Sequence, residues 1–153
     1  MLYNVFKIIH LLGVIVFLGN IVVTGVWKVL ADRTKDPRVI AFARRLVTLT
    51  DCIFTAGGAA FILIGAYGMA FTAELDLRQT WVAWGQGLFV LSGIISVLVL
   101  IPTQIVQARL ARAFAADHTV PESYWRYSRR WYIWGTVATV VPIANLYFMI
   151  FKP

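Results

Sequence analysis

Four long apolar segments alternate with short polar ones along the chain. The apolar segments run over about residues 3–30, 46–71, 81–106 and 131–151. Each is long enough for the roughly 20 residues that an α-helix needs to cross the hydrocarbon core of a bilayer. The pattern predicts an all-α integral membrane protein, a four-helix bundle that forms a single transmembrane domain over residues 1–153.

The composition excludes an ordinary soluble domain. Of the 153 residues, 60% are hydrophobic and the mean hydropathy is +0.77, whereas soluble domains are about 45–50% apolar. A lipid solvent removes the need to bury that surface. The single cysteine, Cys52, excludes an intrachain disulfide and a cysteine-based metal site. No nucleophilic triad, phosphate-binding loop or zinc motif is visible.

The charges of the connectors predict the orientation. Basic residues crowd the connectors 31–45 and 107–130, while connector 72–80 has Glu74 and Asp76 beside a single Arg78. Because cytoplasmic loops carry an excess of Lys and Arg, connectors one and three belong in the cytoplasm and both termini outside. Orientation and contact with anionic lipid then explain the net charge of +7, so we expect no nucleic-acid partner.

Two parts of the basic connectors, Pro37–Leu46 and Gln107–Ala116, carry apolar residues at helical spacing. We expect them either to lie on the membrane surface or to extend the spans. Pro102 and Pro142 fall inside spans three and four, and they predict kinks there.

Polar and small residues share one face of the first span and one face of the fourth. Each face covers an arc of roughly 100° on a helical wheel. Because polar groups are costly in lipid, both faces should line the interior of the bundle. They comprise His10, Gly13, Phe17, Asn20, Thr24, Trp27 and Lys28 in span one, and Trp131, Trp134, Gly135, Ala138, Pro142, Asn145, Met149 and Lys152 in span four.

His10 has two interpretations. It should lie roughly 10 Å inside the outer end at 1.5 Å per residue, near the level of Asn145, Gly65 and Gly87. As a structural residue it hydrogen-bonds to Asn145 or to a backbone carbonyl. As a ligand its imidazole binds a metal, of which haem iron fits best. The glycines leave room for a flat ligand, or they let helices pack closely.

A second polar group is expected at the cytoplasmic end. Lys28 ends span one and Asp51 begins span two, so an ion pair between them is the structural expectation. A proton or anion site is the functional alternative. Gln86, Gln104 and Gln107 are the candidate inward-facing polar residues of span three.

Several short motifs carry a family resemblance. They are Leu2-Tyr3 with Lys7 and His10, Gly13 and Gly19, Ile101-Pro102-Thr103-Gln104, Arg129-Arg130-Trp131 with Trp134-Gly135, and Met149-Ile150-Phe151-Lys152-Pro153. On these motifs the whole chain resembles a group of small, uncharacterised bacterial four-helix integral membrane proteins, defined as a domain of unknown function. The resemblance implies a multi-pass protein of the bacterial inner membrane.

More distantly, Lys7, His10 and Lys152-Pro153 are similar to motifs of the HemJ-type protoporphyrinogen oxidases. Those small four-helix membrane proteins carry a Lys-x-x-His step early in span one and a Lys-Pro near the C-terminus. The resemblance implies a bound haem b with His10 as its metal ligand, and a possible oxidoreductase. It departs at span three, where those oxidases have a lysine shortly after a tryptophan and this chain has Trp84-Gly85-Gln86.

On the haem interpretation, Lys7 would pair with a propionate, Phe17 and Trp84 would line the macrocycle, and Met149 or a histidine of a second protomer would supply the other axial position. Gln86 and Asn145 complete the expected cofactor-binding set. The alternative is a non-enzymatic bundle, a small transporter or a scaffold subunit, which would act as a homo-oligomer or within a larger membrane complex because four short spans seldom enclose a transport path alone.

Overall fold

The computed structural model describes residues 1–115 and 119–152, and these residues fold into four long helical rods. The first rod is α1 and the last is α6. Each middle rod consists of two α-helices joined without a break by a short π-helical segment. The bounds are α1 Leu2–Thr34, α2 Pro37–Thr50, π segment Asp51–Thr55, α3 Ala56–Thr72, α4 Thr80–Ile95, π segment Ser96–Leu100, α5 Ile101–Phe114 and α6 Glu122–Phe151.

A tight turn joins α1 to α2. Lys35 adopts the left-handed conformation, with φ at 55°, and closes the C-terminus of α1. Asp36 then caps α2, because its carboxylate accepts hydrogen bonds from the backbone N–H of Arg38 at 2.8 Å and of Val39 at 3.4 Å. Pro37 supplies the first helical residue, where its missing N–H costs nothing. This local chemistry folds the second rod back along the first.

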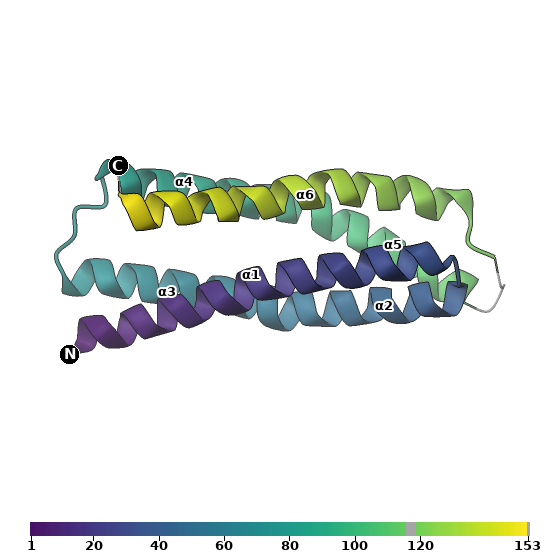
Figure 1. The fold of residues 1–153 in the computed structure, drawn as a ribbon, viewed down its shortest axis with the longest axis horizontal. Coiled ribbons are helices and arrows are strands. Elements are labelled where there is room, and N and C mark those ends of the chain that lie inside the picture. Colours follow the sequence, from purple (N-terminus) through teal and green to yellow (C-terminus); the bar gives the residue numbers. More distant parts are fainter. Residues whose placement is uncertain (116–118, 153) are drawn as a thin grey trace.

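The second hairpin of the bundle bends. Pro102 has no N–H for the helical ladder, and the π-helical segment Ser96–Leu100 stands directly before α5. Both are recognised causes of helix bends. Figure 1 shows α5 leaving the line of α4 and descending toward α2, so α5 contacts both α2 and α6. The bend brings side chains of α5 into contact with both α2 and α6.

Small residues let α1 and α3 approach closely. A Cβ added to Gly13 would lie 2.6 Å from the backbone nitrogen of Ile62, and one added to Gly65 would lie 2.5 Å from the backbone nitrogen of His10. Gly58 faces the backbone of Phe17 in the same way. The α1–α3 pair forms one side of the bundle, and the α4–α6 pair forms the other (Figure 1). Close packing is therefore the role of these glycines, whereas Gly87 has no described atom within 4 Å of an added Cβ.

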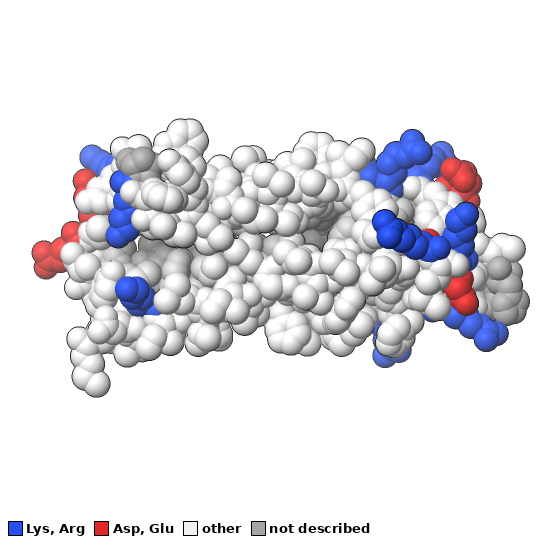
Figure 2. Space-filling view, viewed as in Figure 1, with Lys and Arg blue, Asp and Glu red and all other residues white. Residues whose placement is uncertain are grey.

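An apolar belt surrounds the bundle, and the charges gather at its two ends (Figure 2). All four rods are long and apolar enough to cross a membrane. The 33 residues of α1 extend about 50 Å at 1.5 Å per residue, well beyond the 30 Å or so of hydrocarbon. We call the end that holds the α1–α2 and α5–α6 connections the basic end, after Arg33, Lys35, Arg38, Arg45, Arg109, Arg112, Arg126, Arg129 and Arg130. The opposite end is the termini end.

The predicted all-α membrane fold is confirmed. The two amphipathic pieces of the basic connectors extend the spans, since α2 and α5 continue the rods rather than lying across them. The rods accordingly include the four predicted spans and continue past them at the basic end. Ala116, the last residue of the second predicted piece, lies outside the described residues.

Candidate functional site

A cavity of about 270 Å³ opens inside the termini end of the bundle. All four rods contribute to its wall, which is mainly apolar. The lining includes Tyr3, His10, Val14, Phe17, Leu18, Ile62, Tyr67, Trp81, Gly85, Gln86, Phe89, Pro142, Asn145, Met149 and Lys152. A concave apolar site with a few converging polar groups is the form that small-molecule sites commonly take. The cavity is therefore the first candidate site.

His10 is fixed on the cavity wall by two contacts. Its backbone packs directly on Gly65 of α3, so the ring projects from a closely packed helix pair. Its Nδ1 lies 2.9 Å from the carbonyl oxygen of Ile62 and donates to it when Nδ1 carries the proton. A backbone carbonyl accepts only, so in the neutral ring this contact selects the Nδ1–H tautomer, in which Nε2 carries the lone pair. The structural interpretation named Asn145 or a backbone carbonyl as the partner, and the carbonyl is the one observed.

Asn145 and Met149 approach the cavity from α6. The amide nitrogen of Asn145 donates to the backbone carbonyl of Gly85 at 3.1 Å. Its Oδ1 is buried and has no hydrogen-bond partner among residues 1–115 and 119–152. The methyl group of Met149 occupies the space that a side chain at Gly85 would need. The cavity wall thus holds an unpaired acceptor and a flexible thioether.

The structure brings five of the seven expected cofactor-binding residues together and leaves two outside. His10, Phe17, Gln86, Asn145 and Met149 all line the cavity.

Lys7 is exposed on α1 and is not part of the cavity wall. Trp84 is 53% exposed on the belt and stacks on Phe148, with ring centroids 5.5 Å apart. The arc of polar residues on span one predicted correctly that His10 faces the interior. The sequence could not show which side of α4 packs against α6. The packing of α4 on α6 leaves Trp84 on the outside of the bundle.

Lys152 is the residue at this site that was missing from the expected set. It lines the cavity, and its Nζ lies 4.9 Å from the ring centroid of Trp81. The signal was present in the sequence, since the terminal Lys-Pro belongs to the resemblance motifs and Lys152 falls on the polar face of span four. Lys152, rather than Lys7, is the cation that the fold places at this cavity.

A second polar cluster lies in the middle of the bundle, where the π-helical segment begins. The carboxylate of Asp51 accepts hydrogen bonds from Asn20 Nδ2 at 2.8 Å, from Thr55 Oγ1 at 3.3 Å and from Gln104 Nε2 at 2.9 Å. Asn20 also donates to Thr55 Oγ1 at 2.9 Å. Uncharged donors from three rods therefore satisfy the only carboxylate at this depth among the described residues.

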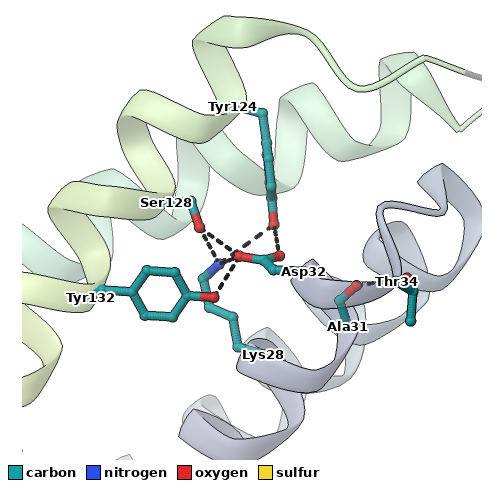
Figure 3. Close-up of polar contacts among 7 residues, drawn as sticks. All are labelled: Lys28, Ala31, Asp32, Thr34, Tyr124, Ser128 and Tyr132. Atoms are coloured by element: carbon teal, nitrogen blue, oxygen red, sulfur yellow. Dashed lines mark hydrogen bonds and ion pairs between the residues drawn. The ribbon is translucent and has the colours of Figure 1, made fainter.

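A third cluster lies at the basic end (Figure 3). Lys28 Nζ donates to Asp32 Oδ2 at 2.6 Å and to Ser128 Oγ at 2.8 Å. Asp32 also accepts from Tyr124 at 2.7 Å, from Ser128 at 2.6 Å and from Tyr132 at 2.7 Å. The ion pair thus joins the end of α1 to the start of α6, and lysine and aspartate are 1% and 7% exposed.

The expected ion pair between Lys28 and Asp51 is wrong. Lys28 is paired within its own helix, with Asp32 at the i+4 position. The residues lie on adjacent turns of one helix face, so the pair forms without any tertiary contact. The rings of Tyr124, Trp131 and Tyr132 then surround the ammonium at 4.7 to 5.4 Å.

The described residues hold no group of three or more His, Cys, Asp and Glu side chains that could bind a metal ion. A metal site built from protein side chains alone therefore has no candidate within them. A metal carried inside a macrocycle is a separate case, because one imidazole is enough to hold it.

Residues 4–153 match the family described as "Predicted integral membrane protein (DUF2269)", so the chain belongs to that family. Searches of curated proteins and of solved structures found no match.

Proposed function

We propose that this DUF2269 protein binds haem b, or a closely related porphyrin, in the cavity at the termini end, where His10 would hold the iron. The contact between His10 Nδ1 and the Ile62 carbonyl is the observation that carries the proposal. Histidines that bind metals commonly donate their second ring N–H to a carbonyl or carboxylate, which fixes the ring and raises the basicity of the ligating nitrogen. His10 has this arrangement beside a cavity.

The size and the polarity of the cavity bear on the fit. Ligand pockets usually measure about 300–1,000 Å³, and this one measures about 270 Å³. Met149 and Lys152, both flexible side chains on its wall, are the groups whose movement would enlarge it. Asn145 Oδ1 is an acceptor still to be satisfied. Haem would therefore fit only after Met149 and Lys152 move and enlarge the cavity.

Different residues of the cavity wall would contact different parts of the haem. His10 provides the imidazole from α1, and Met149 offers a thioether from α6. Lys152 is the cation at the mouth that can pair with a propionate. Phe17 and Phe89, with ring centroids 6.3 Å apart, close the inner wall against water. Bound haem would supply one-electron redox chemistry, as it does in membrane oxidoreductases and electron carriers.

An optical spectrum tests the proposal. Protein produced with haem supplied and purified in detergent should show a Soret band, which His10→Ala should lose. His118→Ala is the matched control, because the chain has only two histidines and this change removes the other one. The control should keep the band. Adding imidazole to a folded His10→Gly variant should restore the band, which a merely structural role for His10 would not do.

A colourless wild-type protein would overturn haem binding. The same preparation separates the alternative function: if colourless protein is cross-linked into a homo-oligomer or with partner chains in native membranes, the scaffold or transporter hypothesis gains support. A coloured protein that keeps its Soret band in His10→Ala would contradict the assignment of the ligand.

The orientation and the membrane are further parts of the proposal. The basic end carries nine exposed basic residues and belongs in the cytoplasm of a bacterium, with both termini and the cavity toward the outer face of the inner membrane. In a Cys52→Ser background, a cysteine at Glu74 should react with a membrane-impermeant maleimide on intact cells, whereas one at Lys35 should react only after lysis. The reverse result would invert the orientation.

A further inference from the structure

A layer of fully buried polar side chains crosses the bundle just inside the basic end. Each of the four rods contributes one member. The members are Lys28 and Arg44, each 1% exposed, Gln107 at 0% and Ser128 at 1%. Polar side chains this deeply buried are rare unless partners satisfy them.

Helix periodicity places these residues at one level. Ile40, Ala111 and Tyr124 pack together in the apolar cluster at the basic end. Arg44 follows Ile40 by four residues and Gln107 precedes Ala111 by four. Both steps move one turn into the bundle on the same helix face, since α2 and α5 run in opposite directions (Figure 1).

Ser128 follows Tyr124 by four residues on α6 in the same way. Its hydroxyl accepts a hydrogen bond from Lys28 at 2.8 Å, which ties the fourth rod into the layer. The apolar cluster, with Phe114 as a further member, lies above the layer and closes it from the basic end.

Half of this layer is satisfied and half is not. Lys28 has Asp32 and Ser128 as partners. Arg44 has none: its Nε and both terminal nitrogens lack hydrogen-bond partners within the described part of the chain. The same holds there for both amide atoms of Gln107 and for the indole nitrogen of Trp131. The unmet groups are mostly donors, since a guanidinium alone presents five N–H groups and no acceptor.

The nearby carboxylates do not meet this demand. Asp32 and Asp51 both act electrostatically on Arg44, but neither is hydrogen-bonded to it. Asp32 is engaged by Lys28 and three hydroxyls, as Figure 3 shows. Asp51 lies seven residues, about 10 Å, further along the rod, where uncharged donors engage it. The layer therefore holds two buried cations, and only Lys28 is paired with a carboxylate of the described residues, that of Asp32.

We propose that Arg44 and Gln107, with the indole N–H of Trp131, form an occluded binding site for a small monovalent anion the size of chloride or formate. The excess of donors calls for acceptor atoms, and the excess of one positive charge calls for a negative one. An anion supplies both the acceptor atoms and the negative charge, whereas water supplies acceptor atoms but no charge. The small size follows from the layer's almost complete burial and the apolar cluster that closes it. The site is independent of the cavity at the termini end.

Thermal unfolding in detergent tests the site, because a ligand that binds only the folded protein raises its midpoint. Gluconate, which is too large for the layer, would be replaced at constant ionic strength by chloride, bromide or formate. The wild-type midpoint should rise and saturate. Arg44→Met should lose the rise while keeping a side chain of similar length in the core. Arg45→Met is the matched control, since it removes the same charge from an exposed neighbour, and it should keep the rise.

Gln107→Leu keeps the test decisive if Arg44→Met fails to fold. Losing one hydrogen bond to a charged ligand should weaken the apparent affinity by about tenfold or more. Broadening of the ³⁵Cl nuclear resonance by wild-type protein, reduced in the Gln107→Leu variant, would be independent support. If no anion gives a saturable rise in the wild type, the layer holds water only and the proposal fails. It also fails if Arg45→Met loses the rise or if Gln107→Leu retains full affinity.

Discussion

Replacing Gly65 with alanine should separate α1 from α3 beside His10. The added Cβ would lie 2.5 to 2.6 Å from the backbone nitrogen, Cα and Cβ of His10. The atoms it meets are backbone and Cβ, so no flexible side-chain end can swing away. To restore a contact of 3.4 Å, the two helices would have to separate by about 0.9 Å, the difference between 3.4 and 2.5 Å.

The expected magnitude follows from two opposing effects. Overpacking a close interface costs about 1–3 kcal/mol, while alanine in a helix interior is favoured over glycine by about 0.5–1 kcal/mol. Gly57→Ala, on the rod that carries Gly65, is the matched control, because no described atom lies within 4 Å of its added Cβ. We expect Gly57→Ala to be neutral or stabilising, and Gly65→Ala to be less stable than this control by about 2 kcal/mol.

Unfolding by SDS in mixed micelles, followed by circular dichroism, measures both variants against the wild type. The same preparations can be examined for the His10 site, because a shift of α1 against α3 moves Nδ1 relative to the Ile62 carbonyl. If Gly65→Ala proved as stable as Gly57→Ala, the inference that small residues set the distance between α1 and α3 would be refuted. Equal losses in both variants would refute it as well, since open space and backbone contact would then have the same consequence.

Two further predictions concern the charges and the belt. Lys28→Met should lower the free energy of unfolding in SDS by about 3–5 kcal/mol, because it leaves the carboxylate of Asp32 buried without its cation. Arg33→Met, at an exposed position of the same helix, is the control and should lower it by less than about 1 kcal/mol. Equal losses in the two variants would contradict the role of the buried pair. Cys52 is exposed and lies in the π-helical segment Asp51–Thr55, midway along the second rod. In liposomes it should therefore resist a water-soluble maleimide, since thiolate formation requires water. A cysteine at Glu74 in the connector should react readily, and rapid labelling of Cys52 would show that the belt does not face lipid.

The sequence alone determined the membrane fold and the direction in which polar side chains face. Lipid acts on each apolar segment separately, so length and hydropathy are enough to predict four spans. The same solvent penalises any polar group that faces it, which is why the arc on span one correctly turned His10, Phe17 and Asn20 toward other helices. The prediction was wrong for Trp27 and Trp134, which the two arcs also turned inward and which are each 39% exposed. Neither inference needs knowledge of which helices pack together.

The tertiary structure alone decided which residues meet. Lys28 and Asp51 were paired by depth, yet depth does not fix the angle around each rod, and the cluster that holds Lys28 is completed by Ser128, 100 residues away. The orphan donors of Arg44 were likewise invisible in the sequence. A hydropathy pattern records how each residue interacts with solvent, whereas partners depend on rotation, bends and close approach, which are fixed only when the rods pack against one another.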